Sequence, residues 1–204
     1  MQIKARQLGQ RFGREIIFSK LDLTLQGAAK TAILGNNGSG KSTLLNVLAG
    51  ALSPTKGELN WSLEGEPLNR ESLPSKISFS SPAMELLEGL SAPEMISFYA
   101  KLKPMKIQGP EILKLSQLEN QKSKPISAYS SGMKQRLKLA LTITADCPFL
   151  FLDEPCSNLD AQFIQWYQEV IDRFAKEKMV FVASNNQQDE YFCCPSKIQI
   201  TDFK

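Results

Sequence analysis

The hydrophobic positions of this chain fall into short runs typical of strands and longer runs with helical spacing. The segment 3–25 alternates polar and apolar residues around two glycines, which predicts antiparallel strands and turns. Apolar runs predict further strands, and apolar positions three and four residues apart predict helices. The predicted strands span residues 31–34, 57–61, 76–79, 149–152 and 179–183, and the predicted helices span 41–52, 92–103, 110–119, 131–145 and 162–176. Strands that alternate with helices favour a mainly parallel α/β sheet.

The middle of the chain has a different character from its flanks. From Glu85 to about Ser127, two helix-forming stretches are separated by Pro104, Gly109 and the polar run 120–124. No internal repeat or low-complexity segment accompanies this change. We therefore expect one domain over residues 1–204, with a small helical insert in its middle.

Composition and charge narrow the classes of function. The 204 residues are 42% hydrophobic, which suits a packed core, and the net charge of +3 is too small to favour nucleic acid or an anionic membrane surface as a partner. No run approaches the roughly 18 consecutive apolar residues of a spanning helix, so we expect no direct membrane insertion. The absence of histidine excludes a histidine-based metal site, triad or general base.

The four cysteines have no C-x-x-C spacing and are expected to be the reduced thiols of a cytosolic protein. Cys147 and Cys156 lie in apolar or loop-like surroundings. The adjacent pair Cys193 and Cys194 leaves two interpretations open, a redox-sensitive pair or ordinary packing.

The strongest chemical signal follows the predicted strand 31–34 directly. Residues 35–43 read GNNGSGKST and fit the pattern G-x-x-x-x-G-K-[ST] between a strand and a helix. Glycines let backbone N–H groups converge on phosphate oxygens, and the helix N-terminus adds its positive dipole end. We expect Lys41 to neutralise the β and γ phosphates of a nucleotide and the Ser42 hydroxyl to bind Mg²⁺. The predicted nucleotide-binding residues of this turn are Gly35, Asn36, Asn37, Gly38, Ser39, Gly40, Lys41, Ser42 and Thr43.

An apolar strand that ends in two acids supplies the second element of the site. Residues 149–154 read FLFLDE. An aspartate at the tip of a buried strand holds the water shell of Mg²⁺, and a following glutamate orients or deprotonates an attacking water. We therefore predict Asp153 as a metal residue and Glu154 as the catalytic carboxylate, although an apolar run before Asp-Glu also occurs at ordinary strand ends.

Between these two elements lies a segment that resembles the signature of ABC-type ATPases. Residues 129–136 read YSSGMKQR where the family has L-S-G-G-Q, and Ser130 and Gly132 are retained. In that family the segment binds the γ-phosphate of the nucleotide held by the opposite subunit. A serine hydroxyl and glycine N–H groups at a helix start form such an anion site. The resemblance therefore implies that Ser130, Ser131 and Gly132 bind nucleotide across a dimer interface.

Two further segments match the family in the expected order. Residues 157–160 read SNLD and resemble the D-loop, which crosses the dimer interface and implies a role for Asp160 at the nucleotide site. Phe12, ahead of Gly13, matches the aromatic residue that stacks on adenine, and Phe18 is its rival for this role.

The sequence departs from the family at two positions. The switch histidine of the family falls at Asn185, which can donate a hydrogen bond to the γ-phosphate but carries neither a transferable proton nor a charge. The resemblance places Asn185 with Lys41 and Glu154 in the catalytic set. The Q-loop glutamine is also missing. Pro82 lies nearest to its position, and Glu85 could take its role only if the alignment with the family were shifted.

The resemblance covers residues 12–185 and implies an α/β fold, a P-loop NTPase of ABC type with an antiparallel β subdomain and a small helical subdomain at about 83–145. It implies a subunit that binds ATP and Mg²⁺, hydrolyses ATP, pairs with an identical or paralogous ATP-binding subunit and energises a separate transmembrane permease. Such a subunit is cytoplasmic and peripheral on the inner face of the cell membrane. Two alternatives stay open, a soluble ATPase of this family acting on ribosomes or DNA, and a nucleotide-gated module with very low hydrolysis because of Asn185.

Overall fold

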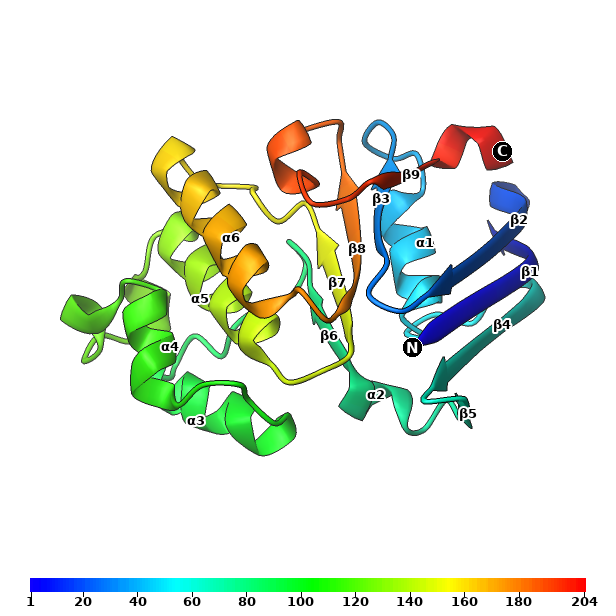
Figure 1. The fold of residues 1–204 in the computed structure, drawn as a ribbon. Coiled ribbons are helices and arrows are strands. Elements are labelled where there is room, and N and C mark those ends of the chain that lie inside the picture. Colours follow the sequence, from blue (N-terminus) through cyan, green and yellow to red (C-terminus); the bar gives the residue numbers. More distant parts are fainter.

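The computed structural model describes residues 1–204, which form two β-sheets with helices between and beside them (Figure 1). The antiparallel sheet has the order β2-β1-β4-β5, and the parallel sheet has the order β6-β7-β8-β3-β9. The predicted parallel sheet and the predicted antiparallel N-terminal strands are therefore confirmed. The strands are β1 Gln2–Phe12, β2 Glu15–Gln26, β3 Lys30–Leu34, β4 Lys56–Leu63, β5 Glu66–Leu68, β6 Ile77–Ser80, β7 Phe149–Asp153, β8 Met179–Ser184 and β9 Ser196–Gln199. The sequence pattern did not predict β5 and β9, because such short strands hold too few apolar positions.

Helices occupy both faces of the parallel sheet. α1 lies between the two sheets, α5 and α6 cover the opposite face of the parallel sheet, and α3 and α4 lie beyond α5 (Figure 1). None of the helices is long and apolar enough to cross a membrane. The helices are α1 Lys41–Leu48, α2 Leu73–Lys76, α3 Ala92–Leu102, α4 Gly109–Leu115, α5 Ser131–Thr144 and α6 Ala161–Phe174, and the 3-10 turns are η1 Glu119–Gln121, η2 Ile126–Ala128, η3 Gln188–Glu190 and η4 Ile200–Phe203.

The central strands β7 and β8 of the parallel sheet are buried along their whole length, as continuous apolar strands predict. In β7, Phe149 and Phe151 belong to the core that contains α1 and the antiparallel sheet, whereas Leu150 and Leu152 belong to the core under α5 and α6. The ring of Phe151 stacks on that of Phe181 in β8, with centroids 4.9 Å apart. Side chains on both faces of the central strands therefore hold these strands in place within the sheet.

α1 ends before the predicted Leu52, so that boundary was wrong. Gly50 has a φ angle of 72°, and the N–H of Ala51 donates a hydrogen bond to Asn46 O at 3.0 Å. These features form a Schellman motif, in which a left-handed glycine lets the chain satisfy the last carbonyls of a helix. The signal that ends the helix is therefore Gly50.

The carboxyl ends of β3, β7 and β8 meet at one edge of the parallel sheet. Leu34 of β3 pairs with Ser184 of β8, and Asp153 of β7 pairs with Ala183 of β8. β8 lies between the other two strands. In open parallel sheets, ligands bind at this edge. The turns that leave these three strands therefore form the candidate site.

Candidate nucleotide site

The turn between β3 and α1 forms one wall of a cavity of about 330 Å³. At Gly40 the φ angle is 106°, and a Cβ added there would lie 2.4 Å from Cγ2 of Ile17. The turn therefore requires glycine at position 40. The residues that line the cavity are Ile17, Asn37, Gly38, Gly40, Lys41, Ser42, Thr43 and Glu154.

Lys41 supplies the positive charge of this cavity. The residue is 4% exposed, and its Nζ donates a hydrogen bond to Asn36 O at 3.0 Å. In the same turn, the Oγ of Ser39 is buried without a hydrogen-bond partner. A buried ammonium group with a single protein acceptor and an unpaired hydroxyl both favour a ligand that is rich in anionic oxygens.

Asp153 stands at the end of β7 with a carboxylate suited to a hard cation. Burial raises the pKa of Asp153, whereas a hydrogen bond from Ser42 and the charge of Lys41 lower it. Its Oδ1 is buried and has no hydrogen-bond partner. The chain has no group of three or more acidic or cysteine side chains that would hold a metal ion alone. A carboxylate and a hydroxyl nevertheless fit Mg²⁺, which takes few protein oxygens and completes its shell with phosphate and water.

Glu154 directly follows β7 and reaches the cavity. Its φ angle of 44° lies in the left-handed region, which residues other than glycine rarely adopt. Its N–H donates a hydrogen bond to Ala183 O of β8 at 2.9 Å. Backbone strain of this kind persists where surrounding contacts enforce it, and it is frequent at functional sites.

Asn185 follows β8 and is exposed in a turn. It is not among the residues that line the cavity around Lys41. β8 lies between β3 and β7 in the sheet. The turn that carries Asn185 therefore leaves the sheet between the turn after β3 and the turn after β7, both of which line the cavity. An exposed amide at this place can contact a phosphate that enters from solvent.

The residues that resemble the signature stand at the start of α5, outside the Lys41 cavity. Ser130 caps the helix with its side-chain oxygen. Ser131 lines a second cavity of about 200 Å³ together with Asn158. The structure therefore does not bring Ser130, Ser131 and Gly132 to Lys41 within one chain.

Of the two aromatic candidates for adenine stacking, only Phe12 presents its ring to solvent. Phe12 ends β1 and is 51% exposed, whereas Phe18 is fully buried in the core between the sheets. Burial removes Phe18 from the candidates, because a stacking ring must offer a free face.

Asp160 and the Q-loop segment lie at the same end of the molecule as the signature. The Oδ1 of Asp160 accepts a hydrogen bond from the Phe163 N–H at 3.0 Å and caps α6. Pro82 and Glu85 line the same small cavity as Ser131. One carboxylate oxygen of Asp160 is therefore already used to cap α6.

Two buried side chains that the sequence did not single out hold the chain just after Glu154. Gln135 of α5 and Glu190 of η3 are 4% and 2% exposed. Gln135 contacts the backbone of Pro155, and Glu190 contacts the backbone of Cys156. Gln135 lies at the end of the segment that resembles the signature, but its burial has no local signal, and Glu190 lies in a polar run.

The chain is similar to known proteins in both its sequence and its fold. Residues 18–157 match the family model described as ABC transporter. The chain is 30% identical over 187 residues to the lantibiotic transport ATP-binding protein SrtF of Streptococcus pyogenes, a match that covers 90% of this chain and 80% of that protein. Its fold is similar to that of a putative ABC transporter ATP-binding protein from Pyrococcus furiosus, with a TM-score of 0.83, 22% identity and 100% coverage of both chains. It is also similar to the ATP-binding cassette MJ0796, solved as a dimer bound to ADP and Pi, with a TM-score of 0.77, 22% identity and coverage of 92% of this chain and 90% of that chain.

Proposed function

Because the chain belongs to the ABC transporter family of ATP-binding proteins, we propose that it binds MgATP and hydrolyses it as one half of a dimer that drives a membrane-spanning partner. The observation that carries this proposal is the meeting of Lys41, Asp153 and Glu154 where β3 and β7 end. In this proposal residues 1–204 are a single ATP-binding domain, and residues 83–145 form its helical subdomain.

The role of each side chain follows from its position. Lys41 binds the β and γ phosphates and stabilises the negative charge that develops on them during transfer. Ser42 and Asp153 hold Mg²⁺, which neutralises phosphate oxygens when it is bound. Glu154 orients the attacking water and takes its proton. Phe12 stacks on the adenine ring.

A second subunit completes the site in this proposal. Ser130, Ser131 and Gly132 lie outside the cavity of their own chain and stand at a helix N-terminus. That place suits a site for the γ-phosphate held by another subunit. The similar cassette MJ0796 was solved as a dimer. The second subunit is an identical chain or a paralogue.

Replacement of Asn185 by histidine is expected to raise ATP turnover about tenfold. The asparagine amide donates a hydrogen bond only as a neutral group, whereas a protonated histidine donates one and also carries a positive charge. Asn185 is exposed, so the larger ring meets no packing barrier. Phosphate release at saturating MgATP measures the change, and Gln187→His in the same turn is the matched control. Equal turnover of Asn185→His and the wild type would show that residue 185 does not act on the γ-phosphate.

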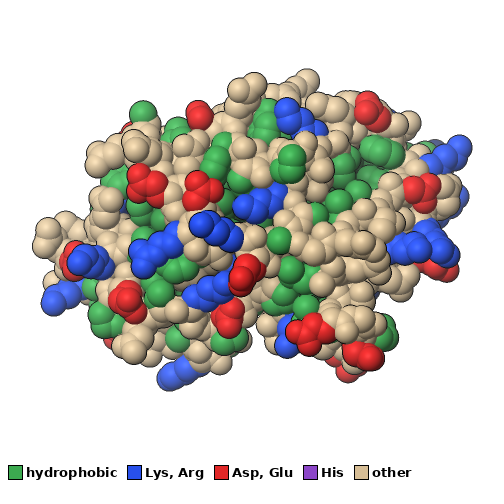
Figure 2. Space-filling view, in the orientation of Figure 1, with side chains coloured by type: hydrophobic (Ala, Val, Ile, Leu, Met, Phe, Trp, Pro, Cys, Tyr) green, Lys and Arg blue, Asp and Glu red, His purple; other side chains and the backbone are tan.

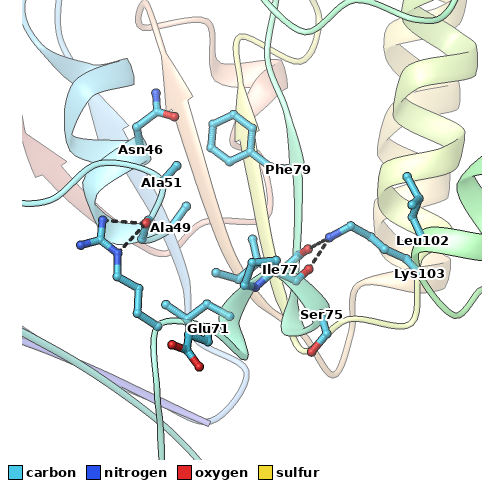
Figure 3. A pocket seen from close by; sticks show the side chains of 13 residues that line it. Asn46, Ala49, Ala51, Glu71, Ser75, Ile77, Phe79, Leu102 and Lys103 are labelled. Atoms are coloured by element: carbon cyan, nitrogen blue, oxygen red, sulfur yellow. Dashed lines mark hydrogen bonds between the residues drawn. The ribbon is translucent and has the colours of Figure 1, made fainter.

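A groove of about 670 Å³ is the proposed docking site for the membrane partner (Figure 3). It lies between the end of α1, α2 and the end of α3, with Phe79 of β6 inside it. Leu102 at the edge of the groove is 60% exposed, and Arg70 and Glu71 add charges of both signs. β6 leads into residues 80–85, which stand where the family has its Q-loop but lack the glutamine. An amphipathic helix of the partner suits this lining. Such a helix would lie beside residues 80–85.

Capture of the partner tests the proposal. Tagged Glu154→Gln protein with MgATP is recovered from detergent-solubilised cells, and the co-purified proteins are identified by mass spectrometry. We expect a protein with several membrane-spanning helices. We also expect Leu102→Glu to lower its recovery about tenfold or more, because the change puts a charge into an apolar contact that the partner would bury. The matched control is Phe192→Glu, at an apolar residue that is 40% exposed outside the groove. Recovery of ribosomes or DNA-bound complexes in place of a membrane protein would overturn the proposal.

The surface charge does not favour a nucleic-acid partner. On the face shown in Figure 2, a few Lys and Arg side chains lie together near the centre, and Asp and Glu side chains surround them. The net charge of the chain is +3. Strong nucleic-acid binding depends on clustered positive charge. In this proposal the chain is cytoplasmic and is held on the inner face of the cell membrane by its partner.

A further inference from the structure

The peptide that joins Pro155 to Cys156 is held at both of its polar groups by buried side chains. Gln135 Nε2 donates a hydrogen bond to Pro155 O at 2.8 Å, and the Cys156 N–H donates one to Glu190 Oε1 at 3.1 Å. Gln135 comes from α5 and Glu190 from η3, which are far apart in the sequence. Loss of a hydrogen bond to a buried group is costly, so these two contacts favour a single orientation of the peptide.

Glu190 also reaches the end of β8. Its Oε2 accepts a hydrogen bond from Ser184 Oγ at 2.5 Å, and its backbone carbonyl accepts one from Tyr167 OH at 2.8 Å. Ser184 directly precedes Asn185. One buried carboxylate therefore joins the segment after β7 to the turn after β8.

The held peptide lies one residue beyond Glu154. The backbone of Glu154 is left-handed, and its N–H is bonded to Ala183 O. A non-glycine residue keeps such a conformation only where its surroundings enforce it. The bond to Ala183 fixes the chain before Glu154, and the contacts of Gln135 and Glu190 fix the chain after it.

We propose that Gln135 and Glu190 are positioning residues that hold the Glu154 carboxylate at the nucleotide cavity. The inference rests on the proposed function, because it is the attack of water on ATP that requires Glu154 to be held in place. Neither Gln135 nor Glu190 lines the cavity, so both act through Glu154 and not on the nucleotide. Through Ser184, Glu190 also sets the start of the turn that carries Asn185.

Replacement of Glu190 by alanine is expected to lower kcat for ATP hydrolysis about tenfold or more, with KM for ATP changed less than about threefold. Glu190→Gln keeps a carbonyl oxygen for the Cys156 N–H and presents an amide to Ser184, so its kcat is expected within about threefold of the wild type. Asp189→Ala, at the exposed neighbour in η3, is the matched control. Hydrogen exchange at the Cys156 amide is expected to quicken in Glu190→Ala and to stay slow in Glu190→Gln.

A double variant separates positioning from general destabilisation. If Glu190 acts through Glu154, the variant with both Glu154→Gln and Glu190→Ala hydrolyses ATP no more slowly than Glu154→Gln alone, because residues that act as a unit are not additive. A further tenfold loss in the double variant would overturn the inference.

Two results distinguish failure of this inference from failure of the proposed function. Wild-type protein without Mg²⁺-dependent turnover would mean that the proposed function fails. Wild-type protein that turns over, with kcat and Cys156 exchange unchanged in Glu190→Ala, would overturn the positioning role alone. Where Glu190→Ala is unfolded by circular dichroism, Gln135→Leu removes the other contact and is expected to give the same loss of kcat.

Discussion

Glu154→Gln is expected to lower ATP turnover about 100-fold or more while leaving the affinity for ATP within about threefold. Glutamine has nearly the same size and keeps one carbonyl oxygen, but it does not take a proton from water. Glu154 is the only carboxylate among the residues that line the cavity, and the chain has no histidine to replace it. The substitution therefore removes the one proton acceptor at the cavity and leaves the phosphate-binding turn intact.

Two measurements check this result. Phosphate release reports turnover, and a fluorescent ATP analogue reports binding, with Glu177→Gln at an exposed acid as the matched control. Where the second subunit is an identical chain, gel filtration with MgATP should show the Glu154→Gln protein as a dimer, because slow hydrolysis keeps the closed state. Turnover close to that of the wild type would refute the role of Glu154. A wild type that itself lacks turnover would support the nucleotide-gated alternative, which Asn185 favours.

The parts of the site that lie on one continuous segment could be predicted from the sequence. The phosphate-binding turn depends on glycines at a fixed spacing between a strand and a helix, and residues 35–43 hold all of them. Likewise, the run 149–152 is apolar throughout because β7 is covered on both faces, and Asp153 marks the point where the strand reaches the sheet edge. In both cases the cause of the structure is local, so the pattern is visible in the sequence.

The parts that escaped prediction depend on contacts between distant segments. Glu190 lies in a polar run that is typical of an exposed loop, yet it is almost fully buried because Ser184 and Cys156 meet it. Phe12 and Phe18 lie in one alternating segment, but the register of β1 with β2 is interrupted by bulges, and Phe18 lies in the core while Phe12 is exposed. A shift of one residue in a strand reverses the face of every side chain. Alternation alone therefore leaves the choice between the two rings open.

Lys41→Met is expected to lower kcat/KM for ATP about 100-fold or more, because a positioned cation that stabilises the transferring phosphate is lost. Lys41 is the only basic residue among those that line the cavity. Unlike Glu154→Gln, this change should weaken both binding and turnover, since Lys41 contacts the phosphates in the ground state as well. Binding of the fluorescent analogue and phosphate release measure the two effects, with Lys56→Met at an exposed lysine as the control.

Lys41→Met is also expected to unfold at a temperature equal to or higher than that of the wild type. The ammonium group of Lys41 is buried with one hydrogen-bond partner, Asn36 O, so the fold bears a desolvation cost that an apolar side chain of similar length removes. Thermal unfolding followed by circular dichroism measures this. A gain in stability together with a loss of ATP binding would show that the buried charge is kept for the nucleotide and not for the fold. A large fall in unfolding temperature would instead mean that Lys41 has a structural role, and the loss of activity would then say nothing about phosphate binding.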